Sequence, residues 1–306
     1  MSATPPDSTP HPSPKNRFRL GLVQLQMRPT ADLDAFYSHI EFFIKTLAGY
    51  GADFIVFPEY VNAPLMAPWN DLGAHAAIRQ LATLTEEIRV WFSQKAVEHG
   101  VNIITGSMPW IRDGKLHNIV YLCRRDGTWD YQLKLHMTPS EESVWQMSGG
   151  DELKVFDTDC GKIGMLICYD SEFPELGRLL ADLGVRVLFV PFCTDTAPGY
   201  HRVRLCSQAR AIENECFVAI AGSVGNLPGV PNMDLHYAQS AVFSPSDFPF
   251  PAQAIVAEAT PNQETALVAD QHTTLMETLH HQGLVQNLRQ RRQDLYQITT
   301  PAPPPP

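Results

Sequence analysis

An abrupt passage from strand to helix is the feature that most constrains the fold of this chain. Residues 163–167 form an apolar run that ends at Cys168, as a buried strand would. Ser171 then gives a helix-start signal, and Pro174 stands in the expected first helical turn. Such a bend exposes the side chain of the residue at its corner, here Cys168. A helix N-terminus beside a cysteine favours thiolate over thiol. The pattern predicts that Cys168 is a nucleophile, although most buried cysteines are small core residues.

Strand and helix patterns alternate along most of the chain. Short apolar or alternating runs are typical of strands, and wider apolar spacing is typical of amphipathic helices. The expected strands are residues 18–26, 53–57, 101–108, 117–123, 129–133, 153–156, 162–167, 186–190, 216–221, 239–243, 254–258 and 265–269. The expected helices are 33–47, 72–99, 172–182, 200–215 and 272–284. This order predicts an α/β fold with mixed sheets flanked by helices.

Composition restricts the partners and the location of the protein. The 306 residues carry a formal net charge of −10, which argues against nucleic acid as a partner. Charged residues make up only 18% of the chain, which favours broad buried interfaces. No apolar run is long enough to cross a membrane. Six cysteines without a secretory signal indicate reduced thiols in the cytoplasm, and the absence of a CxxC pair argues against a structural zinc site.

Both ends of the chain are rich in proline. Residues 1–16 and 299–306 have the low-complexity composition of disordered segments. Residues 17–298 between them are expected to form one domain.

Three ionisable side chains occupy the same place relative to the expected strands. Glu59, Lys134 and Cys168 each follow an apolar, strand-like run. Sites in layered α/β proteins form at the carboxyl ends of strands, so we expect the three to meet in one pocket. Glu59 would accept the proton of Cys168, the thiolate would attack a carbon bonded to nitrogen, and Lys134 would stabilise the oxyanion. Taken singly, such a glutamate or lysine is usually a surface residue, so the inference depends on the joint pattern.

The motifs around these residues resemble the nitrilase superfamily, the carbon–nitrogen hydrolases. The resemblance covers roughly residues 18–297 and lies in FPEY around Glu59, YQLKLHMTPSE around Lys134, GKIGMLICYDSEFPE around Cys168, and ARAIENECFVAIA at 209–221. It implies that Glu59 is the proton acceptor, Lys134 the proton donor and Cys168 the nucleophile. It also implies an α-β-β-α sandwich, subunits that pair through helices flanking the elbow, and no cofactor or metal.

Several further residues are candidates for the site. The resemblance implies a second glutamate after the lysine, and both Glu141 and Glu142 fit. Only one of the two can face the pocket if the segment is extended, and Glu141 is the preferred one. The backbone N–H of Tyr169 is the expected second oxyanion donor.

Polar residues near the start of a later helix are candidates for substrate binding. Thr194, His201 and Arg202 would hold a substrate carboxylate, although such cations more often form ion pairs, for example with Glu213. Asp170 is expected to cap the helix or hold the elbow. His136 would be structural, because Glu59 already serves as the base.

We therefore expect a cysteine-dependent hydrolase that cleaves a non-peptide C–N bond of a small amide and releases ammonia through a thioester. A nitrilase and an N-carbamoyl amidohydrolase would use the same three residues. A glutaminase subunit of an ammonia-channelling complex and a non-catalytic scaffold with the same fold are the remaining alternatives. The resemblance implies a homodimer or a larger homo-oligomer.

Overall fold

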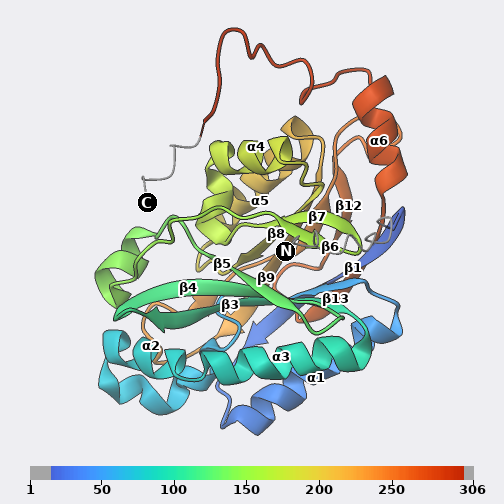
Figure 1. Ribbon diagram of the computed structural model, residues 1–306. Helices are drawn as coiled ribbons and strands as arrows, with labels where there is room; N and C mark the ends of the chain where they lie inside the picture. The colour runs from blue at the N-terminus through green and yellow to red at the C-terminus, as the bar shows by residue number, and fades with distance from the viewer. Residues whose placement is uncertain (1–14, 300–306) are drawn as a thin grey trace, which may run out of the picture.

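Strand β1 (Arg17–Met27) belongs to both sheets of the fold (Figure 1). It pairs in parallel with β2 (Phe54–Val56) and antiparallel with β13 (Thr265–His272), and its last residues pair with β9 (Phe217–Asn226). The computed structural model describes residues 15–299, so most of both proline-rich ends lies outside the described residues. Lys15, at the edge of the first end, forms an ion pair with Asp53 at 2.6 Å.

Two mixed sheets extend from this strand. The first has the order β5-β4-β3-β2-β1, with β3 (Asn102–Arg112), β4 (Lys115–Cys123) and β5 (Trp129–Leu133) forming an antiparallel meander. In the second, β7, β8 and β9 run parallel. Its other strands pair antiparallel at the two edges. The bounds in the second sheet are β6 (Phe156–Thr158), β7 (Gly161–Met165), β8 (Val187–Phe192), β10 (Leu235–His236), β11 (Ala241–Phe243) and β12 (Ile255–Glu258).

Helices cover the outer face of each sheet. In Figure 1, α1 (Leu33–Gly49), α2 (Ala74–Ala82) and α3 (Thr85–His99) lie below the first sheet. Helices α4 (Pro174–Asp182) and α5 (Ala197–Glu213) lie above the second sheet, with α6 (Thr273–Gln282) at one side. The α-β-β-α sandwich expected from the sequence is confirmed. Among the described residues, no helix has both the length and the apolar character needed to span a bilayer.

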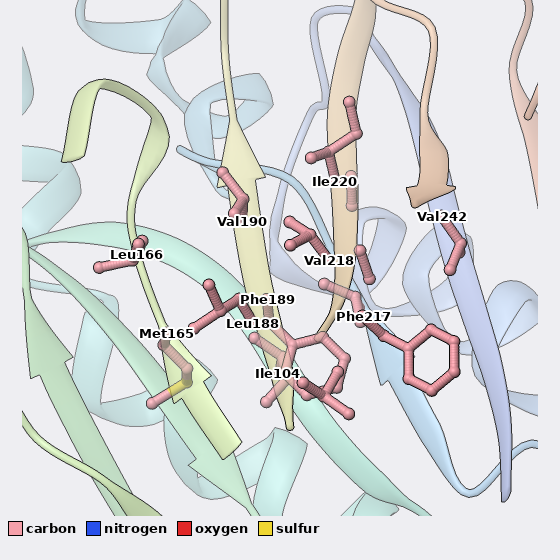
Figure 2. Close-up of a cluster of buried hydrophobic side chains, with 14 of the residues drawn as sticks. Ile104, Met165, Leu166, Leu188, Phe189, Val190, Phe217, Val218, Ile220 and Val242 are labelled. Atoms are coloured by element: carbon pink, nitrogen blue, oxygen red, sulfur yellow. The ribbon is translucent and has the colours of Figure 1, made fainter. Parts of the chain in front are cut away.

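Strand alternation assigns neighbouring residues of β2 to two different hydrophobic clusters. Phe54 and Val56 belong to a cluster that also includes the second sheet and residues of α4, α5 and α6, whereas Ile55 belongs to the cluster packed against the helices α1–α3. Successive side chains of a strand point to opposite faces, so a strand buried on both sides is apolar throughout. Figure 2 shows part of the first of these clusters, in which Ile104 of β3 lies beside side chains of β7, β8 and β9.

The single helix expected over residues 72–99 is wrong. The 3₁₀ helix η1 (Ala63–Leu72) ends where this segment begins, and the segment itself holds two helices, α2 and α3. Gly73 separates η1 from α2 with a φ of 76°, a left-handed value that glycine adopts readily. The chain turns again before α3, where the buried Thr85 hydroxyl donates a hydrogen bond to the carbonyl oxygen of Pro109. Apolar spacing continues across this break, so periodicity could not reveal it.

Candidate active site

The three residues predicted to meet do so at the ends of strands from both sheets. Glu59 follows β2, Lys134 directly follows β5, and Cys168 follows β7. All three line one cavity of about 700 Å³. The sandwich therefore brings together side chains that lie far apart in the sequence.

Lys134 is the centre of the hydrogen bonds in this cavity. Its Nζ lies 2.8 Å from Oε1 of Glu59 and 2.7 and 2.8 Å from the two carboxylate oxygens of Glu141. The lysine side chain is only 1% exposed. A buried charge is stable only when it is paired and hydrogen-bonded, so the two carboxylates and the ammonium must be considered as one unit.

The two carboxylates of this unit have different pKa values. Burial, together with the negative charge of Glu141, raises the pKa of Glu59 to about 7 against the opposing effect of Lys134. Burial also acts on Glu141, but Lys134 and hydrogen bonds from Tyr60 and Thr138 outweigh it and lower the pKa of that group. Glu141 therefore keeps its negative charge, whereas Glu59 exchanges a proton near neutral pH, as a general base must.

Glu141 and Glu142 differ in direction because their segment is a helical turn. The segment is the short π-helix η2 (Glu141–Trp145), so the extended conformation considered for it is wrong. Glu141 is buried and accepts hydrogen bonds from the Tyr60 hydroxyl at 2.5 Å and from the Thr138 N–H at 2.8 Å. Glu142 is exposed to solvent.

Two contacts that the sequence did not reveal hold Glu59 in place. The Asn118 side-chain amide donates to its Oε1 at 2.9 Å, and the backbone N–H of Cys193 donates to its Oε2 at 2.9 Å. Asn118 interrupts the apolar run of β4, and a buried polar residue in a strand was the available signal. No sequence pattern marks the backbone donor of Cys193, because every residue except proline has a backbone N–H.

Cys168 occupies a strained backbone position at the elbow. Its φ is 47°, which is uncommon for a residue other than glycine, and it opens the 3₁₀ helix η3 (Cys168–Glu172) that precedes α4. Burial raises the pKa of its thiol well above the ordinary value, and the charge of Glu59 adds to this effect more than Lys134 offsets it. This raised pKa opposes the effect of the helix N-terminus and favours the thiol, in agreement with the expectation that Glu59 accepts the proton of Cys168.

Asp170 connects the elbow to the segment that carries Lys134. Its carboxylate accepts hydrogen bonds from the backbone N–H groups of Leu135 at 3.1 Å and His136 at 2.8 Å, and His136 Nδ1 lies 2.9 Å away. The His136 ring stacks on Phe173 with 3.6 Å between the ring centroids. These contacts fit the structural roles expected for Asp170 and His136.

The expected substrate-binding residues do not all reach the cavity. Tyr169, Thr194 and Arg202 line it. The Thr194 hydroxyl donates to the Tyr237 carbonyl oxygen at 2.7 Å, and Arg202 Nε lies 3.3 Å from a carboxylate oxygen of Glu172. His201, in contrast, is exposed on α5 with its ring against Tyr200, so its placement among the substrate-binding residues is not supported.

Two curated proteins are similar to this chain over most of its length. "Probable hydrolase YhcX" of Bacillus subtilis is 44% identical over 280 residues, which are 92% of this chain but 55% of YhcX. The chain thus spans about half the length of that relative. "Omega-amidase NIT2" of Xenopus tropicalis is 29% identical over 294 residues, covering 92% of this chain and 98% of the relative.

The fold and the family assignment agree with these similarities. An amidase from Nesterenkonia sp. AN1, solved with the acetamide moiety of fluoroacetamide on its active-site cysteine, superimposes with a TM-score of 0.70 at 21% identity. The match covers 91% of this chain and 95% of the amidase, and it shows a shared fold. The carbon-nitrogen hydrolase family model matches residues 19–279. The chain therefore belongs to the carbon–nitrogen hydrolases of the nitrilase superfamily.

Proposed function

We propose that this protein is a cysteine-dependent amidase that hydrolyses the C–N bond of a small amide and releases ammonia. The observation that carries the proposal is the buried unit of Glu59, Lys134 and Glu141 in the same cavity as the Cys168 thiol. This arrangement provides a nucleophile, a base with a pKa near neutrality, and a cation fixed for a developing negative charge.

The reaction proceeds in two halves. Glu59 accepts the thiol proton as Sγ of Cys168 attacks the amide carbon, and the oxyanion is stabilised by Lys134 and the backbone N–H of Tyr169. Glu59 then protonates the leaving nitrogen, so that ammonia departs and a thioester remains. In the second half, Glu59 removes a proton from water, which attacks the thioester and releases the carboxylic acid and the thiol.

The relatives favour an amide over the other substrates that this chemistry permits. NIT2 is an omega-amidase, and the Nesterenkonia protein is an amidase that carries an acetamide moiety on its cysteine. A nitrilase or an N-carbamoyl hydrolase would use the same residues with a different pocket.

Ammonia release from a panel of simple amides, ω-amides, carbamoyl compounds and nitriles tests the proposal. The expected result is release from amides that depends on Cys168. Ammonia release from nitriles or carbamoyl compounds alone would show that the substrate is not an amide, and it would leave the proposed mechanism unchanged. No release, together with a Cys168 thiol that iodoacetamide does not modify, would favour the scaffold alternative.

The raised pKa of Glu59 predicts how the activity depends on pH. Only the ionised carboxylate can accept the thiol proton, so kcat/KM should rise with pH up to about 7 and fall about tenfold per unit below it. Glu59→Gln should reduce kcat by about 10²–10⁴-fold and remove this acidic limb. A wild-type limb centred near the ordinary glutamate pKa of about 4.3 would contradict the assignment.

We further propose that the protein is a homodimer in the cytoplasm. Leu183 after α4 and Leu205 on α5 are 56% and 60% exposed, and the C-terminal Leu295 is 70% exposed. Exposed apolar side chains on neighbouring elements are typical of subunit interfaces. Light scattering should give twice the chain mass of 34.1 kDa, and Leu205→Glu should shift it toward the monomer. A monomeric wild type would contradict the proposal. All six cysteines are free thiols, as expected in a reducing compartment.

A further inference from the structure

The catalytic cavity carries negative charges that the proposed chemistry does not use. Apart from the unit around Lys134, its acidic and basic lining residues are Glu172, Asp195, Asp234 and Arg202. Asp195 and Asp234 are both exposed at the mouth, and both raise the pKa of the nearby His236, against a larger lowering by burial. Outside that unit, the lining of the cavity therefore has three carboxylates and a single cation.

Glu172 is the carboxylate of this wall that lies nearest to the nucleophile in the sequence. It ends the short helix η3 that Cys168 begins. Its backbone is fixed, because Arg210 donates to the carbonyl oxygens of Ser171 at 3.2 Å and Glu172 at 3.4 Å. Its side chain is 15% exposed, so a ligand that binds it is largely removed from water.

The ion pair of Glu172 is open to exchange. Arg202 approaches it with Nε at 3.3 Å, and the arginine side chain is 62% exposed. An ion pair with so exposed a cation contributes little free energy, because the guanidinium remains largely solvated. Burial raises the pKa of Glu172, and its effect is larger than the opposing effects of Arg202 and Lys134. The ion pair therefore does not fully compensate the burial of the carboxylate. A substrate cation could displace Arg202 into solvent, whereas a substrate carboxylate would have to take Arg202 from Glu172 and remain beside three negative groups.

We propose that the preferred substrate is a small amide whose far end carries a protonated amine, and that Glu172 selects it by a charge-assisted hydrogen bond. The inference rests on the proposed amidase function and names the substrate class of that same site. It reverses the carboxylate-binding role that the sequence suggested for Arg202.

Three amides of similar length test this selectivity. Butanamide with an amino group at its far carbon, pentanamide and succinamate present a cation, an uncharged methyl group and a carboxylate at the same distance from the amide. The wild type should favour the cation over the methyl group by about 10- to 100-fold in kcat/KM. Glu172→Gln should abolish that ratio, because the amide has no negative charge to pair with the ammonium. The matched control is Glu175→Gln, which changes an exposed carboxylate of α4 outside the cavity and should keep the ratio.

A binding measurement separates this inference from the proposed function. Butylammonium should protect Cys168 from alkylation by iodoacetamide in the wild type but not in Glu172→Gln. Butanol and butyrate should not protect Cys168 in either protein. This readout needs no turnover. Turnover of all three amides without a preference for the cation would overturn the inference and leave the amidase intact. Equal protection by the three additives, or protection by butylammonium that survives Glu172→Gln, would overturn it even if no amide were hydrolysed.

Discussion

Cys168→Ala should abolish ammonia release, with a loss on the order of 10⁴-fold or more. The substitution removes the Sγ atom to which the mechanism assigns the acyl group, while Glu59, Lys134 and Glu141 keep their mutual hydrogen bonds. The fold should be preserved, because the substitution deletes one sulfur atom and does not remove a charge. Ammonia assays at several enzyme concentrations, with circular dichroism of the same samples, provide the measurement.

A second cysteine provides the matched control for this variant. Cys206 lies on α5, is partly exposed and is not among the residues that line the catalytic cavity. Cys206→Ala should therefore retain wild-type activity. Hydrolysis by Cys168→Ala at more than about a hundredth of the wild-type rate would show that another group attacks the substrate.

Lys134→Ala should reduce both activity and stability. The variant leaves Glu59 and Glu141 facing each other in a buried site without their shared cation. Breaking a buried ion pair by removing one partner typically costs about 3–5 kcal/mol. Loss of the oxyanion partner should also cost about 10²–10⁴-fold in kcat/KM. Urea unfolding and ammonia release measure the two effects.

A surface lysine separates these effects from the general loss of a positive charge. Lys162 is exposed on β7, and Lys162→Ala should change the free energy of unfolding by less than about 0.5 kcal/mol. If Lys134→Ala were as stable and as active as Lys162→Ala, the unit of one ammonium and two carboxylates would have no catalytic role.

The positions of the catalytic candidates could be predicted because they follow from strand ends. Glu59, Lys134 and Cys168 each come after an apolar run, and the carboxyl ends of those strands meet in the fold. The relative directions of Glu141 and Glu142 could not be predicted from alternation, because the segment is a turn of π-helix. The break between α2 and α3 was missed for a related reason, since the apolar spacing does not change there.

The charge state of Cys168 depends on contacts that no local pattern contains. The sequence shows a helix start beside the thiol, which favours the thiolate. The fold adds burial and the nearby carboxylate of Glu59, which together raise the pKa of the thiol. Burial of an ionised group costs more free energy than a helix terminus returns, so the thiol depends on Glu59 as its base.

The cause of the raised Glu59 pKa is equally non-local. Burial and the charge of Glu141 set it, and neither can be read from the residues around Glu59. The same holds for the donors that position Glu59, which come from Asn118 on β4 and from the backbone after β8.

The most direct test of the mechanism is to trap the acyl group during turnover. An amide that releases ammonia is mixed with the enzyme, the reaction is quenched in acid, and the peptides are analysed by mass spectrometry. We predict a mass increase equal to the acyl group on the peptide that contains Cys168, and no such increase in Cys168→Ala. An acyl group on Cys193 or on another residue would contradict the assignment of Cys168 as the nucleophile. Turnover by the Cys168→Ala variant, even without a labelled peptide, would contradict it as well.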